Sequence, residues 1–256
     1  MIKKRISAAV VLKNNKVVQS FKYKQYLPQG SINTIIQNLD RWGVDDIVVL
    51  DIDRSKNQLG PNLETIRNIS ALPISTPLTY GGGIRSVNDA LKVINAGAER
   101  IILDNLFINQ PNKIKKISAA IGSQAIIISI PFKISEGKIY HFNYLNKRST
   151  KLDFKQIRKY GHLISELLIV DVNSQGSSGS YSSEVIEHFH SLNIGLICYG
   201  GVGMFKEGTQ LLEDRSVNAI AYGNVLNYGE LFFQKIKKSL NKSKQKLRRP
   251  IFREKI

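Results

Sequence analysis

The chain has 256 residues, of which 42% are hydrophobic and 22% charged, a balance typical of one large folded domain. No apolar run reaches the roughly eighteen residues that a membrane-spanning helix needs, and the run after "MIKKR" is too short for a signal peptide. The net charge of +17 suits an acidic partner, but no nucleic-acid-binding motif occurs, so nucleic acid is not an expected ligand. The single cysteine, Cys198, excludes an internal disulfide framework and favours a cytoplasmic location.

Short apolar runs alternate along the chain with helical patterns, many of which begin after Ser, Asn or Asp and end at Gly or Asn. The predicted strands are 6–12, 47–52, 74–79, 100–103, 125–130, 166–171, 195–199 and 218–222. The predicted helices are 32–43, 62–70, 86–97, 110–122, 153–161, 182–193, 205–214 and 228–240. Several strands are apolar on both faces, which is typical of a buried parallel sheet. Eight strand–helix units predict an α/β fold, a single (β/α)8 TIM barrel.

The second half of this pattern repeats the first. The segment "VVLDID" at 48–53 is similar to "LIVDVN" at 168–173, and "TYGGGI" at 79–84 is similar to "CYGGVG" at 198–203. The strand that ends at Asn105 likewise matches the one that ends at Asn224, so the halves are offset by 119 to 120 residues. We therefore expect two half-barrels, about 1–121 and 122–240, followed by a basic C-terminal tail at 241–256.

Glycine loops follow the third and seventh predicted strands, and "DN" at 104–105 and "GN" at 223–224 follow the fourth and eighth. Consecutive glycines let backbone N–H groups approach an anion, and a helix N-terminus behind them favours negative charge. In a (β/α)8 barrel the site lies at the carboxyl ends of the strands. The duplicated pattern predicts two phosphate sites across the barrel mouth. Tight strand–helix turns without a ligand are the alternative.

These motifs resemble the HisF family, the cyclase subunit of imidazole glycerol phosphate synthase, from Lys4 to about Leu231. The matching segments are "KRI", "LDID", "YGGGI", "GSQA", the loop "QGSSGSY" and the glycine pair after the seventh strand. The resemblance implies a barrel that binds a substrate with a phosphate at each end. It also implies a HisH-like glutaminase at the N-terminal barrel face, which delivers ammonia through the barrel. We expect no cofactor and no metal site.

The family's acid–base pair is missing from this sequence. The resemblance places the general acid and the general base at the ends of strands one and five, on the residues Val11 and Pro131, and neither can exchange a proton. Both halves have therefore lost the same function. The candidates for replacement acids are Asp51, Asp104 and Asp171, which can alternatively be structural groups at strand ends.

The phosphate-binding positions are kept unevenly. The resemblance assigns anion binding to Gly83, Asn105, Gly176, Gly201, Gly223 and Asn224. Asp104, however, stands where a neutral Asn is usual, and a carboxylate that faces phosphate oxygens disfavours binding. Gln175 replaces an acid in the loop after strand six. The half that contains Gly201 and Asn224 therefore looks better suited to an anion.

A ring of charges is kept at the other end of the barrel. The family's ammonia gate corresponds to Arg5, Asp46, Arg100 and Glu166, with all four signs retained. Glu99 also keeps the acid that neighbours the glutaminase interface. A purely structural plug at the bottom of the barrel is the alternative.

Other polar residues give weaker signals. The residues His141, His162, His188 and His190 do not fall at predicted strand ends, and we interpret them as surface or packing residues. The basic, aromatic loop at 16–30 can close over a ligand or form a plain hairpin.

Within the family, "VVLK" at 10–13 and "LDIDRSKNQLGPN" at 50–62 resemble the glycosyl amidation-associated branch (WbuZ). The leading hypothesis is a barrel that channels ammonia from a HisH-like glutaminase for amidation of a sugar in surface-glycan biosynthesis. It would act with an ATP-dependent sugar amidotransferase on a phosphorylated or nucleotide-linked sugar. One alternative is an active imidazole glycerol phosphate synthase cyclase with relocated acids, a lyase of histidine biosynthesis. Another is a non-catalytic basic scaffold.

Overall fold

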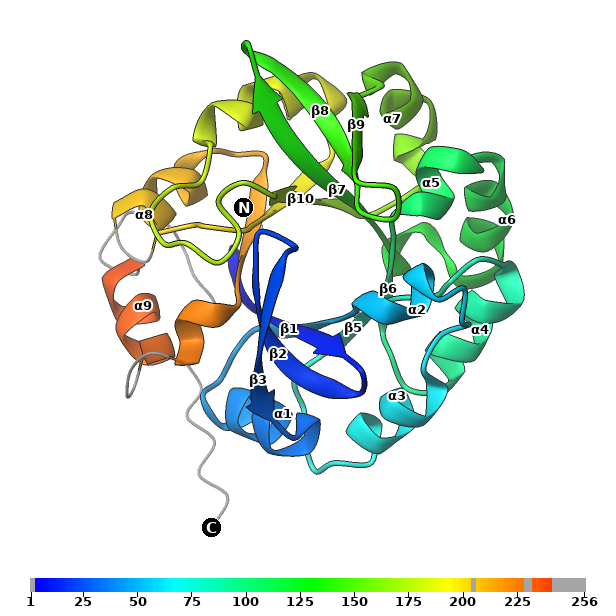
Figure 1. The fold of residues 1–256 in the computed structure, drawn as a ribbon, viewed down its shortest axis with the longest axis vertical. Helices are drawn as coiled ribbons and strands as arrows, with labels where there is room; N and C mark the ends of the chain where they lie inside the picture. The colour runs from blue at the N-terminus through cyan, green and yellow to red at the C-terminus, as the bar shows by residue number, and fades with distance from the viewer. Residues whose placement is uncertain (1–2, 204–205, 228–231, 241–256) are drawn as a thin grey trace.

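The computed structural model describes residues 3–203, 206–227 and 232–240. In this part of the chain, parallel strands close into a barrel because β7 pairs with β10 and β12 pairs with β1 (Figure 1). The barrel strands are β1 (Arg5–Lys13), β4 (Asp46–Asp51), β5 (Leu78–Gly81), β6 (Arg100–Leu103), β7 (Ile126–Ser135), β10 (Glu166–Asp171), β11 (Gly195–Tyr199) and β12 (Val217–Tyr222). The predicted (β/α)8 barrel is confirmed, whereas the predicted tail, 241–256, lies outside the described residues.

Helices surround the barrel where the sequence predicts them. They are α1 (Ile32–Arg41), α3 (Leu63–Ser70), α4 (Val87–Asn95), α6 (Asn112–Ile121), α7 (Phe154–Tyr160), η3 (Ser183–Leu192), α8 (Lys206–Glu213) and α9 (Phe232–Leu240). Short turns of helix are α2 (Ile52–Lys56), α5 (Asn105–Asn109), η1 (Ser123–Ala125), η2 (Gly161–Leu163) and η4 (Asn224–Asn227). The predicted helix at 182–193 is a 3-10 helix, and those at 205–214 and 228–240 begin in residues that are not described.

Four of the helix caps that the sequence suggests form, whereas Ser182, before η3, makes no side-chain cap hydrogen bond. The side chains of Ser31, Asn62, Ser86 and Asp153 each accept a hydrogen bond from a backbone N–H in the first turn of the helix that follows. None of the helices in the described ranges combines the length and the apolar character that a membrane crossing requires.

The third barrel strand lies later than predicted. The prediction was 74–79, but β5 begins at Leu78. Proline cannot donate a ladder hydrogen bond, and Pro77 precedes the strand directly. The segment before it is held as a loop instead, because Asp40 Oδ1 accepts hydrogen bonds from the backbone N–H groups of Ser75 and Thr76, each at 3.0 Å.

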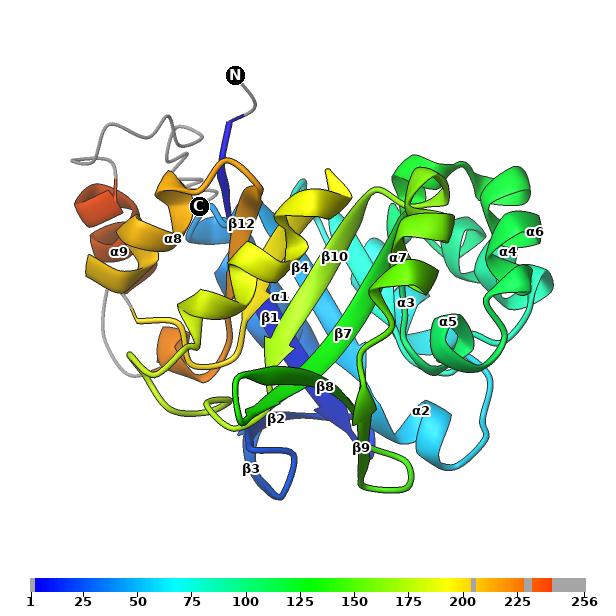
Figure 2. The same cartoon turned by 90° about the horizontal axis from the view of Figure 1, so that it is seen from above.

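Two antiparallel hairpins extend from the barrel, one after each of the strands that begin the predicted half-barrels. The first consists of β2 (Lys16–Phe21) and β3 (Gln25–Gly30), and the second of β8 (Lys138–Asn143) and β9 (Arg148–Lys151). Figure 2 shows both at the same end of the barrel, opposite the N-terminus. The segment 16–30 is thus a hairpin, one of the two alternatives that the sequence left open. The second hairpin was not predicted.

Apolar side chains fill the barrel interior as well as the layer between strands and helices. Alternate residues of each strand point inward, as the pleat of a closed sheet requires. The interior cluster consists of Ala9, Val48, Ile102, Ile127, Leu168, Val170, Ile197, Tyr199, Ala219 and Ala221. Tyr23, from the turn of the first hairpin, and Leu50 pack against this cluster at the end of the barrel that carries the hairpins.

The glycine loops of the two halves match with an offset of 118 residues, so the predicted offset of 119 is wrong there. A Cβ on Gly82 would lie 2.4 Å from the Asp51 carbonyl oxygen, and one on Gly200 would lie 2.6 Å from that of Asp171. Gly82 is therefore the counterpart of Gly200. Tyr80 packs in the outer core but Tyr199 inside the barrel, which also contradicts their alignment. The half-barrel boundaries stay a prediction.

Candidate functional site

The two positions of the lost acid–base pair lie at the barrel mouth. Val11 pairs with Leu50 and Pro131 pairs with Val170 across neighbouring strands, and paired residues share one face of a sheet. Leu50 and Val170 belong to or pack on the interior cluster, so Val11 and Pro131 also face the interior. Their side chains are hydrocarbon, and neither can give or take a proton.

Asp51 and Asp171, two candidate replacement acids, lie on the opposite face of their strands. Each follows an inward-facing residue, Leu50 or Val170, and so points toward the surrounding loops and helices. Asp171 holds the loop after β10, because its carboxylate accepts hydrogen bonds from three backbone N–H groups at 3.0 to 3.1 Å. Asp51 accepts one from Asn62 Nδ2 at 3.3 Å, and burial raises its pKa to about 6.

Asp104, the third candidate acid, lies at the mouth in contact with a histidine. It directly follows β6 and lies near Tyr23, which packs against the interior cluster: burial raises the pKa of Tyr23, and the charge of Asp104 adds to that rise. His141 Nε2, from β8, lies 3.4 Å from Asp104 Oδ1. Burial raises the pKa of Asp104, and the hydrogen bond and charge of His141 oppose that rise. The Asp104 side chain keeps 14% of its surface exposed, so the carboxylate borders the mouth.

The interpretation of His141 as a surface or packing residue is therefore incomplete, because the ring also contacts a candidate site acid. This contact could not be predicted without the second hairpin. A signal is nevertheless present: the residues "SEGK" at 135–138 form a two-residue turn with Glu136 and Gly137 at positive φ. A hairpin prediction there would have placed His141 beside the mouth.

The first hairpin lies across the mouth. Tyr23, in its turn, packs edge-on against Phe142 with ring centroids 6.0 Å apart. The Gln175 carbonyl accepts a hydrogen bond from Lys22 N at 2.9 Å, and Gln175 Oε1 accepts one from Tyr23 N at 3.3 Å. Gly176 provides the room for this contact, since a Cβ there would lie 2.7 Å from Phe21 Cδ1. Gln175 and Gly176, in the loop after β10, thus hold the first hairpin in place over the mouth.

The predicted phosphate residues of the second half line one pocket of about 70 Å³. Four of them border it: Gly176, Gly201, Gly223 and Asn224. The lining also includes Gln175, Tyr199 and Gly200, and contains no charged side chain. Backbone N–H groups in a lining without charged side chains form a suitable environment for an anion, although the Glu207 carboxylate lies just outside the lining, where it accepts a hydrogen bond from Gly203 N at 2.9 Å.

Of the predicted phosphate residues of the first half, Gly83 is engaged with the protein itself, whereas the buried Asn105 side-chain amide has no hydrogen-bond partner among the described residues. The Gly83 N–H donates to Ser55 Oγ at 3.2 Å, and a Cβ on Gly83 would lie 2.7 Å from the Gly60 backbone. Burial raises the pKa of Tyr144, while its hydrogen bond to Ser55 opposes the rise. The loop after β4 and the second hairpin therefore occupy the space beside Gly83 and Asn105.

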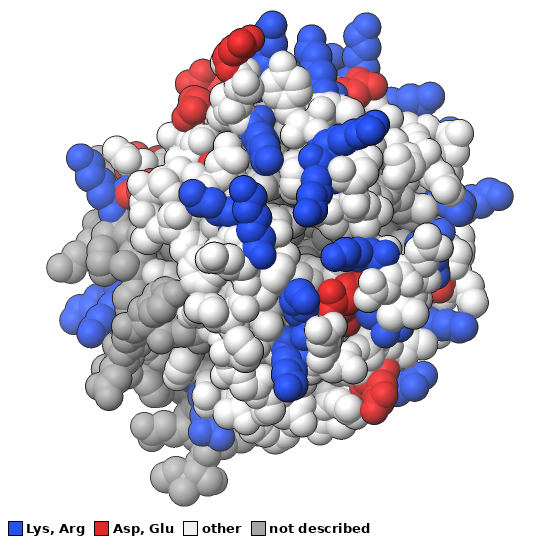
Figure 3. All heavy atoms as spheres, viewed as in Figure 1, with Lys and Arg blue, Asp and Glu red and all other residues white. Residues whose placement is uncertain are grey.

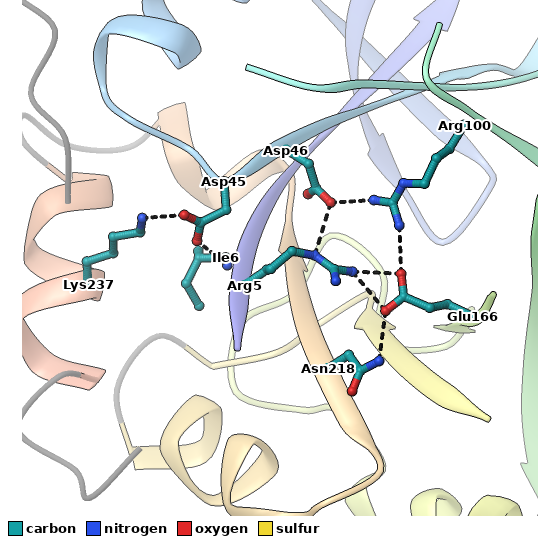
Figure 4. Close-up of polar contacts among 8 residues, drawn as sticks. All are labelled: Arg5, Ile6, Asp45, Asp46, Arg100, Glu166, Asn218 and Lys237. Atoms are coloured by element: carbon teal, nitrogen blue, oxygen red, sulfur yellow. Dashed lines mark hydrogen bonds and ion pairs between the residues drawn. The ribbon is translucent and has the colours of Figure 1, made fainter. Parts of the chain in front are cut away.

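The four predicted gate residues form a closed ring of ion pairs at the N-terminal face (Figure 4). Arg5 Nη2 lies 2.7 Å from Glu166 Oε2, and Arg5 Nε lies 3.3 Å from Asp46 Oδ2. Arg100 bridges the same two acids, at 2.6 Å from Asp46 and 2.7 Å from Glu166. Burial alone would raise the pKa of Glu166, but Arg5, Asn218 and Arg100 together hold it below its ordinary value.

Asn218 is a fifth member of this ring that the sequence did not predict. Its Nδ2 donates to Glu166 Oε1 at 2.9 Å. An irregularity in the pairing of β11 with β12, at Leu196 and Ile197, shifts the strand register beside it. Gly195 makes the room, since a Cβ there would lie 2.0 Å from Asn218 Nδ2. A glycine at the start of a buried strand was the available signal.

Two hydroxyl groups lie inside the barrel, between the ion-pair ring and the mouth. Ser7 is two residues beyond Arg5 on β1, and Thr79 pairs with Val48, an interior residue. Both side-chain oxygens are buried and have no hydrogen-bond partner among the described residues. Beside the ring, Lys237 of α9 forms an ion pair with Asp45 at 2.8 Å, which fastens the last described helix to this face (Figure 4).

The mouth face carries a basic rim. Figure 3 shows Lys and Arg side chains gathered around the centre of this face, with few acids among them. The segments 13–30 and 133–151, which contain the two hairpins and the strand ends that lead into them, contribute one acid, Glu136, and nine basic residues: Lys13, Lys16, Lys22, Lys24, Lys133, Lys138, Lys147, Arg148 and Lys151. Such a field attracts anionic ligands.

Comparisons with known proteins agree with this architecture. Residues 5–232 match the family model described as "Histidine biosynthesis protein". A Vibrio vulnificus protein provisionally named imidazole glycerol phosphate synthase subunit hisF2 is 31% identical over 90% of this chain and 85% of its own length. The HisF subunit of an Exiguobacterium species is 29% identical over 93% of each chain, and a provisional hisF2 of Campylobacter jejuni is 29% identical over 94% and 96%. The chain therefore belongs to the histidine biosynthesis protein family, as a HisF-like (β/α)8 barrel.

Proposed function

We propose that this barrel conducts ammonia from a HisH-like glutaminase at its N-terminal face to a sugar substrate at its mouth. It would act in the cytoplasm as one subunit of a glutamine-dependent amidotransferase complex of surface-glycan biosynthesis, without cyclase chemistry of its own. One observation carries the proposal: the ring of Arg5, Asp46, Arg100 and Glu166 is intact, while Val11 and Pro131 occupy the acid–base positions.

The barrel interior supports this proposal. Ammonia is small, uncharged and able both to donate and to accept hydrogen bonds. The unpartnered hydroxyls of Ser7 and Thr79 offer it polar contacts between apolar walls. Buried polar groups normally have partners, so two free hydroxyls inside the barrel suit a molecule in transit. The sugar as acceptor rests on the sequence resemblance to the amidation-associated branch alone.

The glutaminase interface is the first test. Glu99 is exposed next to Arg100, where β6 begins at the N-terminal face. We expect the purified barrel to bind a HisH-like glutaminase and to raise its glutamate release. Reversing the charge with Glu99→Arg should weaken binding at least tenfold in calorimetry, since like charges across an interface oppose docking. Glu136→Arg makes the same change at the opposite face and is the matched control. Absence of a complex, or equal effects of both changes, would refute the proposed docking.

The ring itself is tested in the assembled complex with the sugar amidotransferase. Arg5→Ala should lower amidation that depends on glutamine more than amidation that depends on added ammonium salt. The two reactions share the acceptor site, so a general loss of folding would lower both. If the ratio of the two rates does not change, the ring has no part in ammonia delivery.

One observation favours a second candidate function, an active cyclase of histidine biosynthesis. Asp104 lies at the mouth, where a relocated proton donor would be useful. The test is an ammonium-dependent cyclase assay with the ribonucleotide substrate of the histidine pathway. Turnover that Asp104→Asn abolishes would establish this function, and absence of turnover from folded protein would leave the ammonia conduit.

A further inference from the structure

We infer that the barrel mouth takes a ligand with a single anionic end, bound in the second half, and an N–H-donating end, bound at the Asp104–His141 pair. The ligand class is a phosphorylated sugar with an amide or amidinium group. This inference rests on the proposed function and specifies its substrate. Three features of the described residues lead to it.

The first feature is the contrast between Asp104 and Gly223. Both follow an inward-facing residue of their strand by two positions, Ile102 in β6 and Ala221 in β12, so they occupy corresponding places in the two halves. Gly223 borders the pocket of the second half, whose lining contains no charged side chain. Asp104 places a carboxylate at the corresponding point of the first half, where a phosphate would be repelled.

The second feature is the use of the Gly83 N–H within the protein itself. The Gly83 N–H, which would face a phosphate, already donates to Ser55 Oγ at 3.2 Å. Gly83 is also covered by the Gly60 backbone, 2.7 Å from where its Cβ would lie. In the second half a Cβ on Gly201 would also lie close to a loop backbone, 2.6 Å from the Ser174 carbonyl oxygen, but a pocket of about 70 Å³ remains beside Gly201 and Gly223.

The third feature is the chemistry of the Asp104–His141 pair. Asp104 offers acceptor oxygens at the mouth, and His141 Nδ1 is buried without a hydrogen-bond partner among the described residues. In the neutral tautomer whose Nε2–H points to Asp104, His141 Nδ1 is an acceptor, so an amide or amidinium N–H is a complementary donor for it and for the carboxylate, beside which a positive charge is favoured. A phosphate offers only acceptors and negative charge, so it does not fit here.

The experiment uses the isolated barrel with two probes, inorganic phosphate and acetamidinium chloride, followed by NMR. Phosphate should shift the backbone signals of Gly201 and Gly223 but not that of Gly83. Acetamidinium should shift the ring signals of His141, and both probes should bind together without displacing each other. Equal phosphate shifts at Gly83 and Gly201, or no acetamidinium shift at His141, would overturn the inference.

Two variants keep the test sharp. Asp104→Asn should weaken acetamidinium binding at least tenfold while phosphate binding at Gly201 stays unchanged, which also shows that the variant folds. Gly223→Asp should do the reverse, because it places a carboxylate in the second half; a Cβ there meets no atom closer than 3.3 Å. Neither measurement involves the glutaminase. A failure here would leave the ammonia route intact, and failure of glutaminase docking would leave the ligand assignment intact.

Discussion

Ser20 and Asn224 hydrogen-bond to each other in both directions. The Ser20 N–H donates to Asn224 Oδ1 at 3.2 Å, and Asn224 Nδ2 donates to the Ser20 carbonyl at 2.8 Å. The pair joins β2 to the segment after β12, so it fastens the first hairpin to the second half of the mouth. The resemblance assigns Asn224 to phosphate binding; the residue borders the second-half pocket, and its side-chain amide holds the hairpin backbone.

Loss of the Asn224 side chain should loosen the hairpin. Each hydrogen bond contributes about 1 kcal/mol net, so Asn224→Ala should increase the open population roughly tenfold or more. Trypsin cleavage after Lys22 and Lys24, both in the hairpin turn, measures that population. Asn143→Ala removes a local hydrogen bond to Leu145 N in the other hairpin and is the control. Equal cleavage of wild type and Asn224→Ala would show that other contacts hold the hairpin.

Gly82 should be intolerant of any side chain. Its φ is +140°, and an added Cβ would lie 2.4 Å from the Asp51 carbonyl oxygen. Gly82→Ala is expected to lower the free energy of unfolding by about 2–4 kcal/mol in urea titrations, since strain and overlap act together. Gly60→Ala is the control, because nothing lies within 4 Å of its Cβ position. A loss below about 1 kcal/mol for Gly82→Ala would mean that the loop can shift.

The ion-pair ring should make the free energy of unfolding depend on pH in the acidic range. The Arg5 and Arg100 charges and the Asn218 hydrogen bond hold the pKa of Glu166 below its ordinary 4.5 despite burial. The stabilisation is therefore fully present above pH 4.5 and is lost as the pH falls through the lower, folded-state pKa. Urea titrations between pH 3 and pH 6 should show this loss in wild type, and Glu166→Gln should show a shallower one. An identical acid dependence in both proteins would exclude Glu166 as its source.

The sequence predicts the features that depend on local patterns, and it misses contacts between segments that are distant in the chain. The barrel follows from local apolar periods and helix caps, and the ring of Arg5 and Glu166 follows from the family resemblance. The contact of His141 with Asp104 did not follow, because it needs a hairpin that the apolar pattern did not reveal. Asn218 was missed because a register irregularity, invisible in residue alternation, turns it toward Glu166. The β5 start was missed because a proline ended the pairing.

Asp51 should weaken the folded state near neutral pH. Burial raises its pKa from 3.8 to about 6, so between these values the folded chain holds a proton that the unfolded chain has released. The free energy of unfolding should then fall as the pH rises from 3.8 to about 6, by at most about 3 kcal/mol. Asp51→Asn keeps an acceptor for Asn62 and removes the charge, so it should remove this slope and stabilise the protein at pH 7.5.

The corresponding residue in the other half, Asp171, gives the opposite expectation. Its carboxylate accepts three backbone N–H groups, and an amide has one oxygen to offer them. Asp171→Asn should therefore destabilise the protein at pH 7.5, by about 1–3 kcal/mol for buried donors left unpaired. Urea titrations of both variants at pH 5 and pH 7.5 measure the two effects. If Asp51→Asn also destabilises the protein at pH 7.5, the charged Asp51 carboxylate stabilises the folded state, and the predicted cost of burying it is wrong.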